Sequence, residues 1–319
     1  MDGLQKVETG EALALADAES SRRYAEASRA ESTKRAYRAD WRAFAAWAEA
    51  RGLSPLPASP GAVCAFLAHE AERGRKVSTI ERRLAAIALA HRAAGLESPT
   101  RDEAVRTTLK GIRREKGAAP RQKRAADADV IRELVRLCDT STLRGLRDRA
   151  LLLLGFAGAF RRSELAGLEA GDVEFREDGN LWVHLRRSKT DQEGQGRGVP
   201  IVRGRFFCPV GALRAWLAGA GIASGPVFRR LGKGGKVQAG ALSGHSIGKA
   251  VKRYAERAGL RAEDFGGHSL RAGFVTAAAE AGKDVWAIMD VSRHRSVQTV
   301  RAYVRRADAF KGHAGEGLL

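Results

Sequence analysis

The sequence contains few cysteines, and they lie far apart. Only Cys64, Cys138 and Cys208 occur among 319 residues, and no two of them form a C-x-x-C pair. Small disulfide-held domains are dense in cysteine, and structural zinc sites use closely spaced ligands. The pattern therefore argues against both classes. We expect the three side chains to be small buried hydrophobes in a reducing compartment.

Long apolar runs are also missing. The longest, residues 150–154, is far shorter than the roughly 20 residues that a membrane-spanning helix needs, and its length is typical of a core helix. Residues 1–10 include Asp2, Lys6 and Glu8 and lack the apolar segment of a secretion signal. We therefore expect a cytoplasmic protein with no membrane partner.

Acidic residues are outnumbered by basic ones. The chain has 37 Asp and Glu against 56 Lys and Arg, which gives a formal net charge of +19. Lys and Arg on a surface bind polyanions because they release the counterions that phosphates hold. No carboxylate cluster of the kind that holds two catalytic metal ions is evident. We expect double-stranded DNA as the partner, no small-molecule substrate, and no metal or other cofactor.

Composition and periodicity divide the chain into four regions. Residues 1–31 have weak periodicity and are expected to be poorly ordered. Residues 32–117 have the spacing of four amphipathic helices. Residues 118–127 combine a proline with several cations and no apolar pattern, which is typical of a linker. Residues 128–319 form a second, mixed region. The fold class is thus mostly α with a small antiparallel β-sheet, in two domains.

The helical region carries start signals and an excess of cations. Ser59-Pro60 is a cap followed by proline at the first helical position, and Ser78-x-x-Glu81 is a capping box. These motifs predict the beginnings of the second and third helices. The exposed faces are expected to be crowded with basic side chains, which are Arg73, Arg75, Lys76, Arg82, Arg83, Arg106, Lys110, Arg113 and Arg114.

The mixed region alternates between helical and strand patterns. Residues 172–175, 181–185 and 199–202 are predicted to form a small antiparallel sheet. Residues 229–240 are rich in Gly and Lys, so we expect a mobile loop there. Further helices are predicted at residues 209–218, 247–258, 270–281, 286–289 and 297–305.

Six side chains suited to phosphodiester chemistry occur in the mixed region, namely Arg161, Lys189, His268, Arg271, His294 and Tyr303. A guanidinium can hold two phosphate oxygens, an imidazole can donate to or accept from the same group, and a phenol supplies a nucleophilic oxygen. His268 and Arg271 are three positions apart, so they share a face of a helix. The combination indicates a tyrosine that attacks DNA.

Four residues of these motifs also have a plain structural interpretation. Arg161 stands beside Arg162, and either could point inward, although the motif favours Arg161. Glu164 could orient a site histidine or be solvated. Lys189 lies in a polar Lys-Thr turn, where a lysine is usually solvated. Tyr303 has valine close by on a predicted helix, where a tyrosine is usually half-buried packing.

The order of these motifs resembles the tyrosine recombinase (phage integrase) family. It runs from Arg161-x-x-Glu164-Leu165 through Lys189 and His268-x-x-Arg271 to His294 and Tyr303. The resemblance covers roughly residues 32–309. It implies an all-α, SAM-like domain that binds core DNA, followed by a mixed α/β catalytic domain, the two forming a C-shaped clamp on the duplex.

The resemblance also implies a mechanism. Tyr303 would attack the scissile phosphate and form a 3′-phosphotyrosyl link, which frees a 5′-hydroxyl. Arg161 and Arg271 would bind the phosphate oxygens as charge develops, and His268 and His294 would assist. Lys189 would protonate the departing oxygen. The cations are expected to stabilise the tyrosine as phenolate. Each step exchanges one phosphoester for another, so neither ATP nor a metal is required.

The implied assembly is a homotetramer on two recombination sites, each an inverted repeat about a short spacer. Residues 304–319 would dock on a neighbouring protomer. The protein would then be associated with the nucleoid. Two alternatives remain open. A type IB topoisomerase uses nearly the same residues but works as a monomer and reseals the same strand, and a non-catalytic relative would act as a repressor or an architectural protein.

Overall fold

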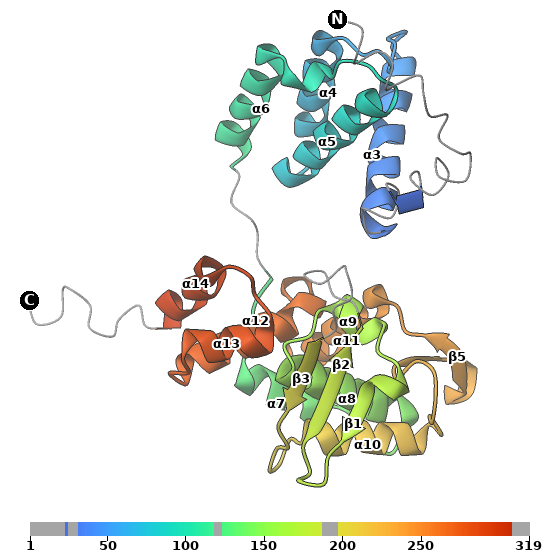
Figure 1. Ribbon diagram of the computed structural model, residues 1–319, viewed down its shortest axis with the longest axis vertical. Helices are drawn as coiled ribbons and strands as arrows, with labels where there is room; N and C mark the ends of the chain where they lie inside the picture. Colours follow the sequence, from blue (N-terminus) through green and yellow to red (C-terminus); the bar gives the residue numbers. More distant parts are fainter. Residues whose placement is uncertain (1–22, 25–30, 118–122, 187–196, 308–319) are drawn as a thin grey trace, which may run out of the picture. The chain divides into compact units, whose positions relative to one another are not determined.

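The computed structural model describes residues 23–24, 31–117, 123–186 and 197–307 (Figure 1). By its contacts the chain forms two compact units, residues Met1–Arg121 and Gln122–Leu319. Each unit has hydrophobic clusters of its own. Over the described residues, no helix is both long and apolar enough to cross a membrane.

Between residues 31 and 117, the first unit has four helices and one short 3₁₀ turn. They are α3 (Glu31–Glu49), α4 (Pro60–Glu72), α5 (Val77–Ala93), η1 (Pro99–Arg101) and α6 (Glu103–Lys116). The prediction of four helices is confirmed. Their apolar faces meet in a core where the ring of Phe66 contacts those of Phe44 and Trp47, with centroids 5.1 and 5.3 Å apart. Aromatic pairs at such distances add to the stability that burial provides.

The two predicted helix starts have different outcomes. Ser59 caps α4, because its hydroxyl accepts a hydrogen bond of 3.1 Å from the amide of Ala62. The predicted capping box at Ser78 and Glu81 is wrong. Helix α5 already begins at Val77, and Glu81 pairs instead with Arg113 of α6 at 2.7 Å. A carboxylate that can reach a neighbouring guanidinium gains a charge-assisted bond there.

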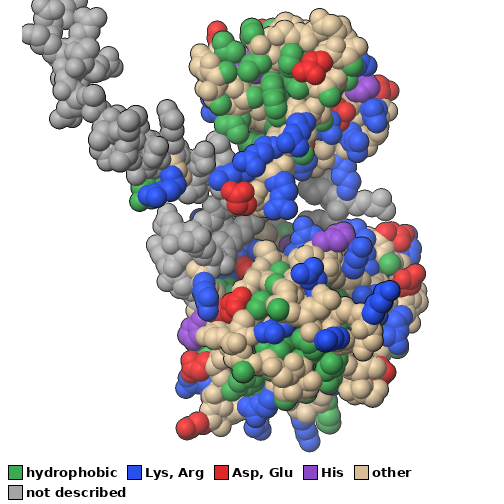
Figure 2. All heavy atoms as spheres, turned by 90° about the vertical axis from the view of Figure 1, so that its right-hand side faces the viewer, with side chains coloured by type: hydrophobic (Ala, Val, Ile, Leu, Met, Phe, Trp, Pro, Cys, Tyr) green, Lys and Arg blue, Asp and Glu red, His purple; other side chains and the backbone are tan. Residues whose placement is uncertain are grey.

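Part of the predicted basic surface is internal. Arg83 has only 13% of its side chain exposed and lies between two buried carboxylates, 3.6 Å from Asp40 and 2.6 Å from Glu70. The prediction that it is exposed is wrong, because a buried carboxylate needs a cation beside it. Arg82 also binds Asp40. On the face drawn in Figure 2, Lys and Arg side chains still gather along one edge of this unit.

The second unit combines helices with a small sheet. The helices are α7 (Ala128–Arg136), α8 (Leu143–Ala157), α9 (Arg162–Ala166), α10 (Pro209–Gly219), α11 (Gly244–Arg257), α12 (Gly267–Glu280), α13 (Val285–Ser292) and α14 (Val297–Ala307). Short 3₁₀ turns lie at Ala170–Asp172, Lys233–Gly235 and Ala262–Asp264. The predicted helices are confirmed within a few residues. Helix α8 is central and packs against α7, α10 and α12, as the buried run at residues 150–154 predicts (Figure 1).

The three-stranded sheet is antiparallel in the order β1 (Val173–Phe175), β2 (Leu181–Leu185) and β3 (Arg197–Ile201). Leu181 pairs with Phe175 on one side and with Ile201 on the other. Alternate residues of β2 are buried, since successive side chains point to opposite faces. The predicted sheet is confirmed, with β3 beginning two residues earlier than expected.

The predicted mobile loop is wrong. Residues 229–240 lie almost entirely in a hairpin of β4 (Arg229–Leu231) and β5 (Val237–Ala241). Phe228 and Leu242 flank the two strands and are both buried, with the amide of Leu242 bonded to the carbonyl oxygen of Phe228 at 2.6 Å. The glycines that suggest mobility serve the turn, where Gly234 has a φ of 70° that favours glycine.

Part of the predicted linker belongs to the second unit. Ala126 is fully buried, and its amide donates to the carbonyl oxygen of Ser269 on α12 at 3.0 Å. Gly273 makes this approach possible, because a Cβ at that position would lie 1.8 Å from the carbonyl oxygen of Ala126. Residues 118–122 of the predicted linker lie outside the described residues.

The three cysteines are free. Cys138 is buried as predicted, whereas Cys64 and Cys208 are partly exposed, so the expectation of full burial is wrong for these two. The sulfur of Cys208 accepts a hydrogen bond from the amide of Gly211 and thereby caps α10. A cap position lies at the end of a helix, which leaves the side chain near solvent.

Candidate active site

The site is built on the turn that joins α8 to α9. Ala159 has a positive φ of 46°, and Phe160 beside it is buried. Arg161 then caps the start of α9 in an extended conformation, and Glu164 folds back on it. The Glu164 carboxylate accepts from the Arg161 amide at 2.9 Å and from its guanidinium at 2.6 Å. The turn therefore fixes the direction of the Arg161 side chain.

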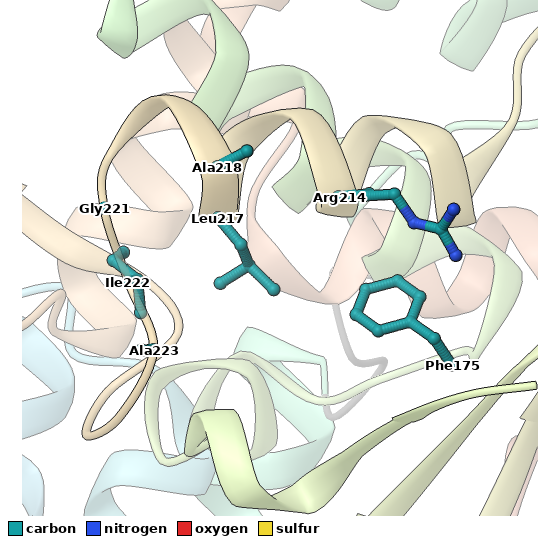
Figure 3. A pocket seen from close by; sticks show the side chains of 7 residues that line it. All are labelled: Phe175, Arg214, Leu217, Ala218, Gly221, Ile222 and Ala223. Carbon is teal, nitrogen blue, oxygen red and sulfur yellow. The ribbon is translucent and has the colours of Figure 1, made fainter.

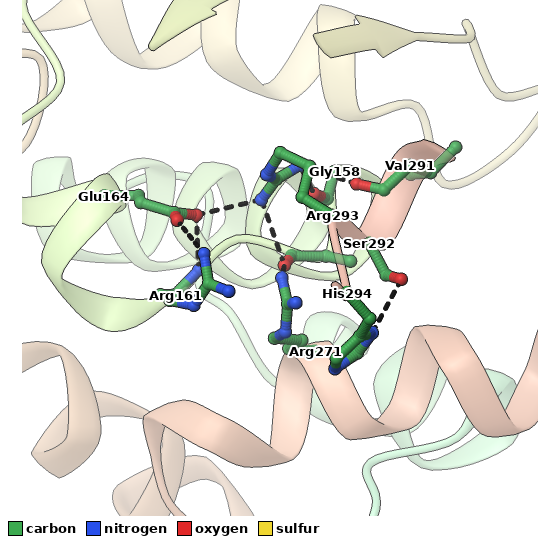
Figure 4. Close-up of polar contacts among 9 residues, drawn as sticks. Gly158, Arg161, Glu164, Arg271, Val291, Ser292, Arg293 and His294 are labelled. Carbon is green, nitrogen blue, oxygen red and sulfur yellow. Dashed lines mark hydrogen bonds and ion pairs between the residues drawn. The ribbon is translucent and has the colours of Figure 1, made fainter. Parts of the chain in front are cut away.

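Glu164 is a buried carboxylate with two cationic partners. Its side chain is 1% exposed, and Nη2 of Arg293 donates to it at 2.8 Å (Figure 4). Burial alone would raise the pKa of Glu164, but the Arg293 charge and the bonds from Arg161 outweigh burial and lower it. The interpretation of Glu164 as a solvated residue is wrong, and the carboxylate binds two arginines, Arg161 and Arg293, where a histidine was the other expected partner.

Arg271 reaches the same turn from α12. Its side chain is buried, and Nη1 donates to the carbonyl oxygen of Ala159 at 2.9 Å. Nη2 is buried and has no hydrogen-bond partner. Burial and then repulsion from Arg161 and Arg293 lower the pKa of Arg271 to about 9, so the group is still charged at neutral pH. A buried donor without a partner is costly, and an anion bound there would satisfy it.

His294 lies beside Arg271 (Figure 4). Its Nδ1 shares a hydrogen bond of 2.8 Å with the hydroxyl of Ser292. Burial, and then the charges of Arg271, Arg161 and His268, lower the pKa of His294 to about 4. The imidazole is therefore neutral at pH 7 and can donate one hydrogen bond or accept one. His268, the second residue of α12, is exposed.

Tyr303 lies on α14 and packs against the cluster formed by Val275, Ile288 and Val300. Burial raises the pKa of its phenol, and the charge of Arg271 opposes this shift. The net direction is upward, so the expectation that the cations hold Tyr303 as phenolate is wrong for this arrangement. The desolvation of the ring outweighs the attraction of one buried guanidinium. The phenol is protonated at neutral pH.

The choice between the two adjacent arginines follows from their surroundings. Arg161 is turned toward Glu164 and acts electrostatically on Arg271 and His294. The Arg162 side chain is exposed and lies over Gly267, the first residue of α12. Arg161 is therefore the one that faces the cluster. Lys189 belongs to residues 187–196, which lie outside the described residues, between β2 and β3.

Sequence reasoning missed Arg293. In the sequence it belongs to a polar run, Ser292 to Ser296, and nothing there indicates burial. In the structure it is a central residue, with 3% of its side chain exposed and its guanidinium against Glu164. Its burial depends on a left-handed backbone conformation at the end of α13, with φ 58° and ψ 40°. A sequence pattern carries no direct signal for that conformation in a residue other than glycine.

A shallow groove elsewhere in the second unit lacks this chemistry. It lies between the end of α10 and β1 (Figure 3) and is lined by Phe175, Arg214, Leu217, Ala218, Gly221, Ile222 and Ala223. The Arg214 guanidinium lies 4.9 Å from the centre of the Phe175 ring and covers it. None of the predicted site residues lines the groove. Among the residues that the structure describes, no three His, Cys, Asp or Glu side chains form a group that would hold a metal ion.

Comparison with known families gives two matches that together span most of the chain. Residues 124–309 match the phage integrase family, and residues 23–97 match the phage integrase N-terminal SAM-like domain. An integrase/recombinase xerD homolog of Selenomonas ruminantium is 38% identical over 97% of this chain and 90% of that protein. Recombinase Cre of Escherichia phage P1 is 27% identical over 85% of this chain and 83% of that protein. The chain belongs to the phage integrase family of tyrosine recombinases, as the motif order predicts.

Solved structures agree on the fold. A dimer of lambda integrase residues 75–356 bound to a core site matches with a TM-score of 0.59, at 18% identity, over 86% of this chain and 89% of that one. The XerH site-specific recombinase bound to a palindromic difH substrate matches with a TM-score of 0.58, at 19% identity, over 83% and 73%. At these identities the likeness concerns the fold alone.

Proposed function

We propose that this protein is a site-specific recombinase that cuts and rejoins DNA through a 3′-phosphotyrosyl intermediate on Tyr303. Its relatives in the family are recombinases, and its net charge of +19 suits a DNA partner. The observation that carries the proposal is the buried Nη2 of Arg271, a charged donor without a partner, in a cluster with Arg161 and His294. A phosphate group would supply the missing acceptor.

The proposed reaction exchanges one phosphoester for another. The Tyr303 oxygen attacks phosphorus as its proton passes to water, a P–O bond to tyrosine forms, and the bond to the 5′ oxygen breaks. Lys189 supplies a proton to that oxygen. Arg161 and Arg271 hold the non-bridging oxygens, and His268 and His294 contribute hydrogen bonds. Loss of either arginine would lower the cleavage rate by on the order of 10²–10³.

The phosphate would be both the group that Tyr303 attacks and the acceptor that Nη2 of Arg271 lacks. The pKa of the phenol is raised by burial, so its proton must leave as the new bond forms. A bound phosphodiester brings negative charge next to Arg271 and satisfies Nη2, which has no partner otherwise. The cost of leaving that donor unsatisfied is then relieved when a phosphate group is bound, and this favours a site that acts on a phosphodiester.

The proposed assembly is a homotetramer on two sites, each an inverted repeat. The XerH complex is described with a palindromic substrate, and the lambda integrase complex is a dimer on its core site. For this chain we propose the same kind of arrangement, in which protomers related by a twofold axis bind the two halves of an inverted repeat. The docking tail predicted at residues 304–319 lies mostly outside the described residues. A clamp on the duplex, with cytoplasmic action on the nucleoid, stays a prediction.

The test begins with the DNA sequence that the protein selects from a random duplex library. Two copies of this site are placed in one plasmid, and the products are separated on a gel. We expect deletion or inversion between the sites with the wild-type protein and none with Tyr303→Phe. Relaxation of plasmids without any site preference would instead support a topoisomerase. Binding without strand exchange in either protein would support a non-catalytic DNA-binding function.

A further inference from the structure

Arg293 has a backbone conformation that an arginine rarely adopts. It ends α13 with φ 58° and ψ 40°, in the left-handed region, where a Cβ is crowded and glycine is the usual residue. Its amide donates to the carbonyl oxygen of Met289 at 2.6 Å, so the strained turn is part of the helix end. A strained residue persists when the rest of the structure holds it in place.

The guanidinium of Arg293 makes contacts that explain why the strain is tolerated. Nη1 donates to the carbonyl oxygens of Gly158 at 2.9 Å and Val291 at 2.6 Å. Nη2 donates to Glu164 at 2.8 Å and to the carbonyl oxygen of Ala159 at 3.3 Å. These bonds join the end of α13 to the turn after α8.

The same turn holds both arginines of the proposed phosphate site. The Ala159 carbonyl oxygen accepts from Arg271 as well as from Arg293. The Glu164 carboxylate accepts from Arg161 as well as from Arg293 (Figure 4). Arg293 thus shares one acceptor with each of them. It also directly precedes His294, so a shift at the end of α13 would move that ring.

We infer that Arg293 is a positioning residue for DNA cleavage, which acts through Glu164 and the Ala159 carbonyl to hold Arg161 and Arg271 in place. The inference rests on the proposed function, because it concerns the rate of that reaction. Arg293 itself is buried against the Phe160 ring, 5.1 Å from its centre, and the bonds described above are to protein atoms, so its effect on DNA is indirect. Replacement should therefore lower the cleavage rate without weakening DNA binding.

Arg147 offers a matched control in the same unit. It is also a buried arginine, with 6% of its side chain exposed, and it forms an ion pair of 2.8 Å with Asp148. It further donates to the carbonyl oxygen of Arg229, which belongs to the β4–β5 hairpin. Lysine at either position keeps the charge but loses the fork of donors. Arg293→Lys and Arg147→Lys should both unfold at a lower temperature than wild type, whereas Arg293→Lys alone should slow DNA cleavage.

The experiment measures covalent adduct formation on a suicide duplex that carries the selected site, at a temperature where each variant is folded. We expect Arg293→Lys to form adduct at least tenfold more slowly than wild type, with a DNA affinity within twofold. Arg147→Lys should form adduct at the wild-type rate. A rate within threefold of wild type for Arg293→Lys, or equal losses in both variants, would overturn the inference. If the lysine variant does not fold, Arg293→Gly takes its place in the experiment, because glycine removes the side chain and also relieves the backbone strain.

A double-mutant cycle with Glu164→Gln separates positioning from general loosening. If Arg293 acts through Glu164, the double variant should be little slower than the slower single variant. Losses that multiply would show independent roles and would contradict the inference. The cycle measures the total amount of covalent protein–DNA adduct, whichever residue carries the DNA. An adduct that persists in a separate Tyr303→Phe variant would therefore refute the assignment of the nucleophile and leave the inference about Arg293 standing. A wild-type protein that forms no adduct would count against the proposed function, and against this inference with it.

Discussion

At the scale of single residues, burial sets the protonation of the site. His294 lies among Arg271, Arg161 and His268, and its pKa is lowered to about 4. We therefore predict that its imidazole signals in NMR titrate near pH 4, well below the usual 6.5. The spectrum of His294→Gln identifies the resonance. A midpoint at or above pH 6.5 would contradict both the burial of the ring and the effect of the neighbouring cations.

The same shift makes folding sensitive to acid. Between pH 6.5 and about 4 the unfolded chain binds a proton at His294 that the folded chain does not bind. The unfolded state is therefore favoured as pH falls through this window, and stability rises with pH across it. We expect His294→Gln to flatten this part of a plot of unfolding temperature against pH. An unchanged slope would contradict the assignment.

Glu164 should contribute to stability through its charge. Its carboxylate is buried between Arg161 and Arg293, so Glu164→Gln leaves two guanidiniums with a neutral partner. We expect a loss of roughly 3 kcal/mol in the free energy of unfolding, measured by denaturant titration. The control is Glu174→Gln, at a half-exposed carboxylate paired with Arg176, where a change below about 1 kcal/mol is expected. Similar losses in both would contradict the buried pairing.

The pH dependence of the Glu164 contribution follows from its lowered pKa. Below its usual pKa of 4.5 the unfolded carboxylate takes up a proton while the folded one stays ionised. The stabilisation is thus fully present above pH 4.5 and is lost as pH falls through the folded pKa. Wild type should lose stability in this range more steeply than Glu164→Gln.

The limits of sequence reasoning are clear at this scale. Arg161, His268, Arg271, His294 and Tyr303 can be picked out because phosphoryl chemistry needs those residue types, and the motifs keep them in order. Their protonation cannot be deduced in the same way, since it depends on how far each is desolvated. Tyr303 is the example, because its pKa is raised where the cations alone would lower it.

At the scale of elements, helix α12 is held against the chain before α7 by a glycine. A Cβ on Gly273 would lie 1.8 Å from the carbonyl oxygen of Ala126, so Gly273→Ala must push α12 outward. Arg271 is two residues away on this helix. We expect a loss of roughly 1–3 kcal/mol in stability, measured by denaturant titration, and slower DNA cleavage.

The control for this prediction is an exposed glycine in a helix. A Cβ added to Gly111 on α6 would meet no atom within 4 Å, so Gly111→Ala should stabilise the protein by roughly 0.5–1 kcal/mol. An alanine at Gly273 that is equally well tolerated would contradict the close approach of α12 to Ala126.

Elements are easier to predict than their ends and turns. Periodicity identifies the helices and the three-stranded sheet because one face of each must be buried. The predicted capping box of α5 is wrong, since Glu81 has a partner on another helix. The β4–β5 hairpin resembles a loop in sequence, because its strands are short and the burial that anchors it lies at Phe228 and Leu242, outside the glycine-rich run.

At the scale of the whole molecule, charge should dominate DNA affinity. A net charge of +19 predicts many phosphate contacts, each of which releases counterions. If roughly six to ten contacts form, affinity should fall by roughly 10³–10⁵ between about 50 and 200 mM salt. Fluorescence anisotropy with a labelled duplex measures this slope. A DNA affinity that hardly changes with salt concentration would contradict binding through contacts to the DNA phosphates.

The proposed chemistry depends on one covalent bond. The chain has four tyrosines, Tyr24, Tyr37, Tyr254 and Tyr303, so the site of attachment can be decided directly. The protein is trapped on a suicide duplex, digested and mapped by mass spectrometry. We predict that the nucleotide is attached to Tyr303 alone. Attachment to another tyrosine, or a strand cut without any protein–DNA link, would contradict the proposed mechanism.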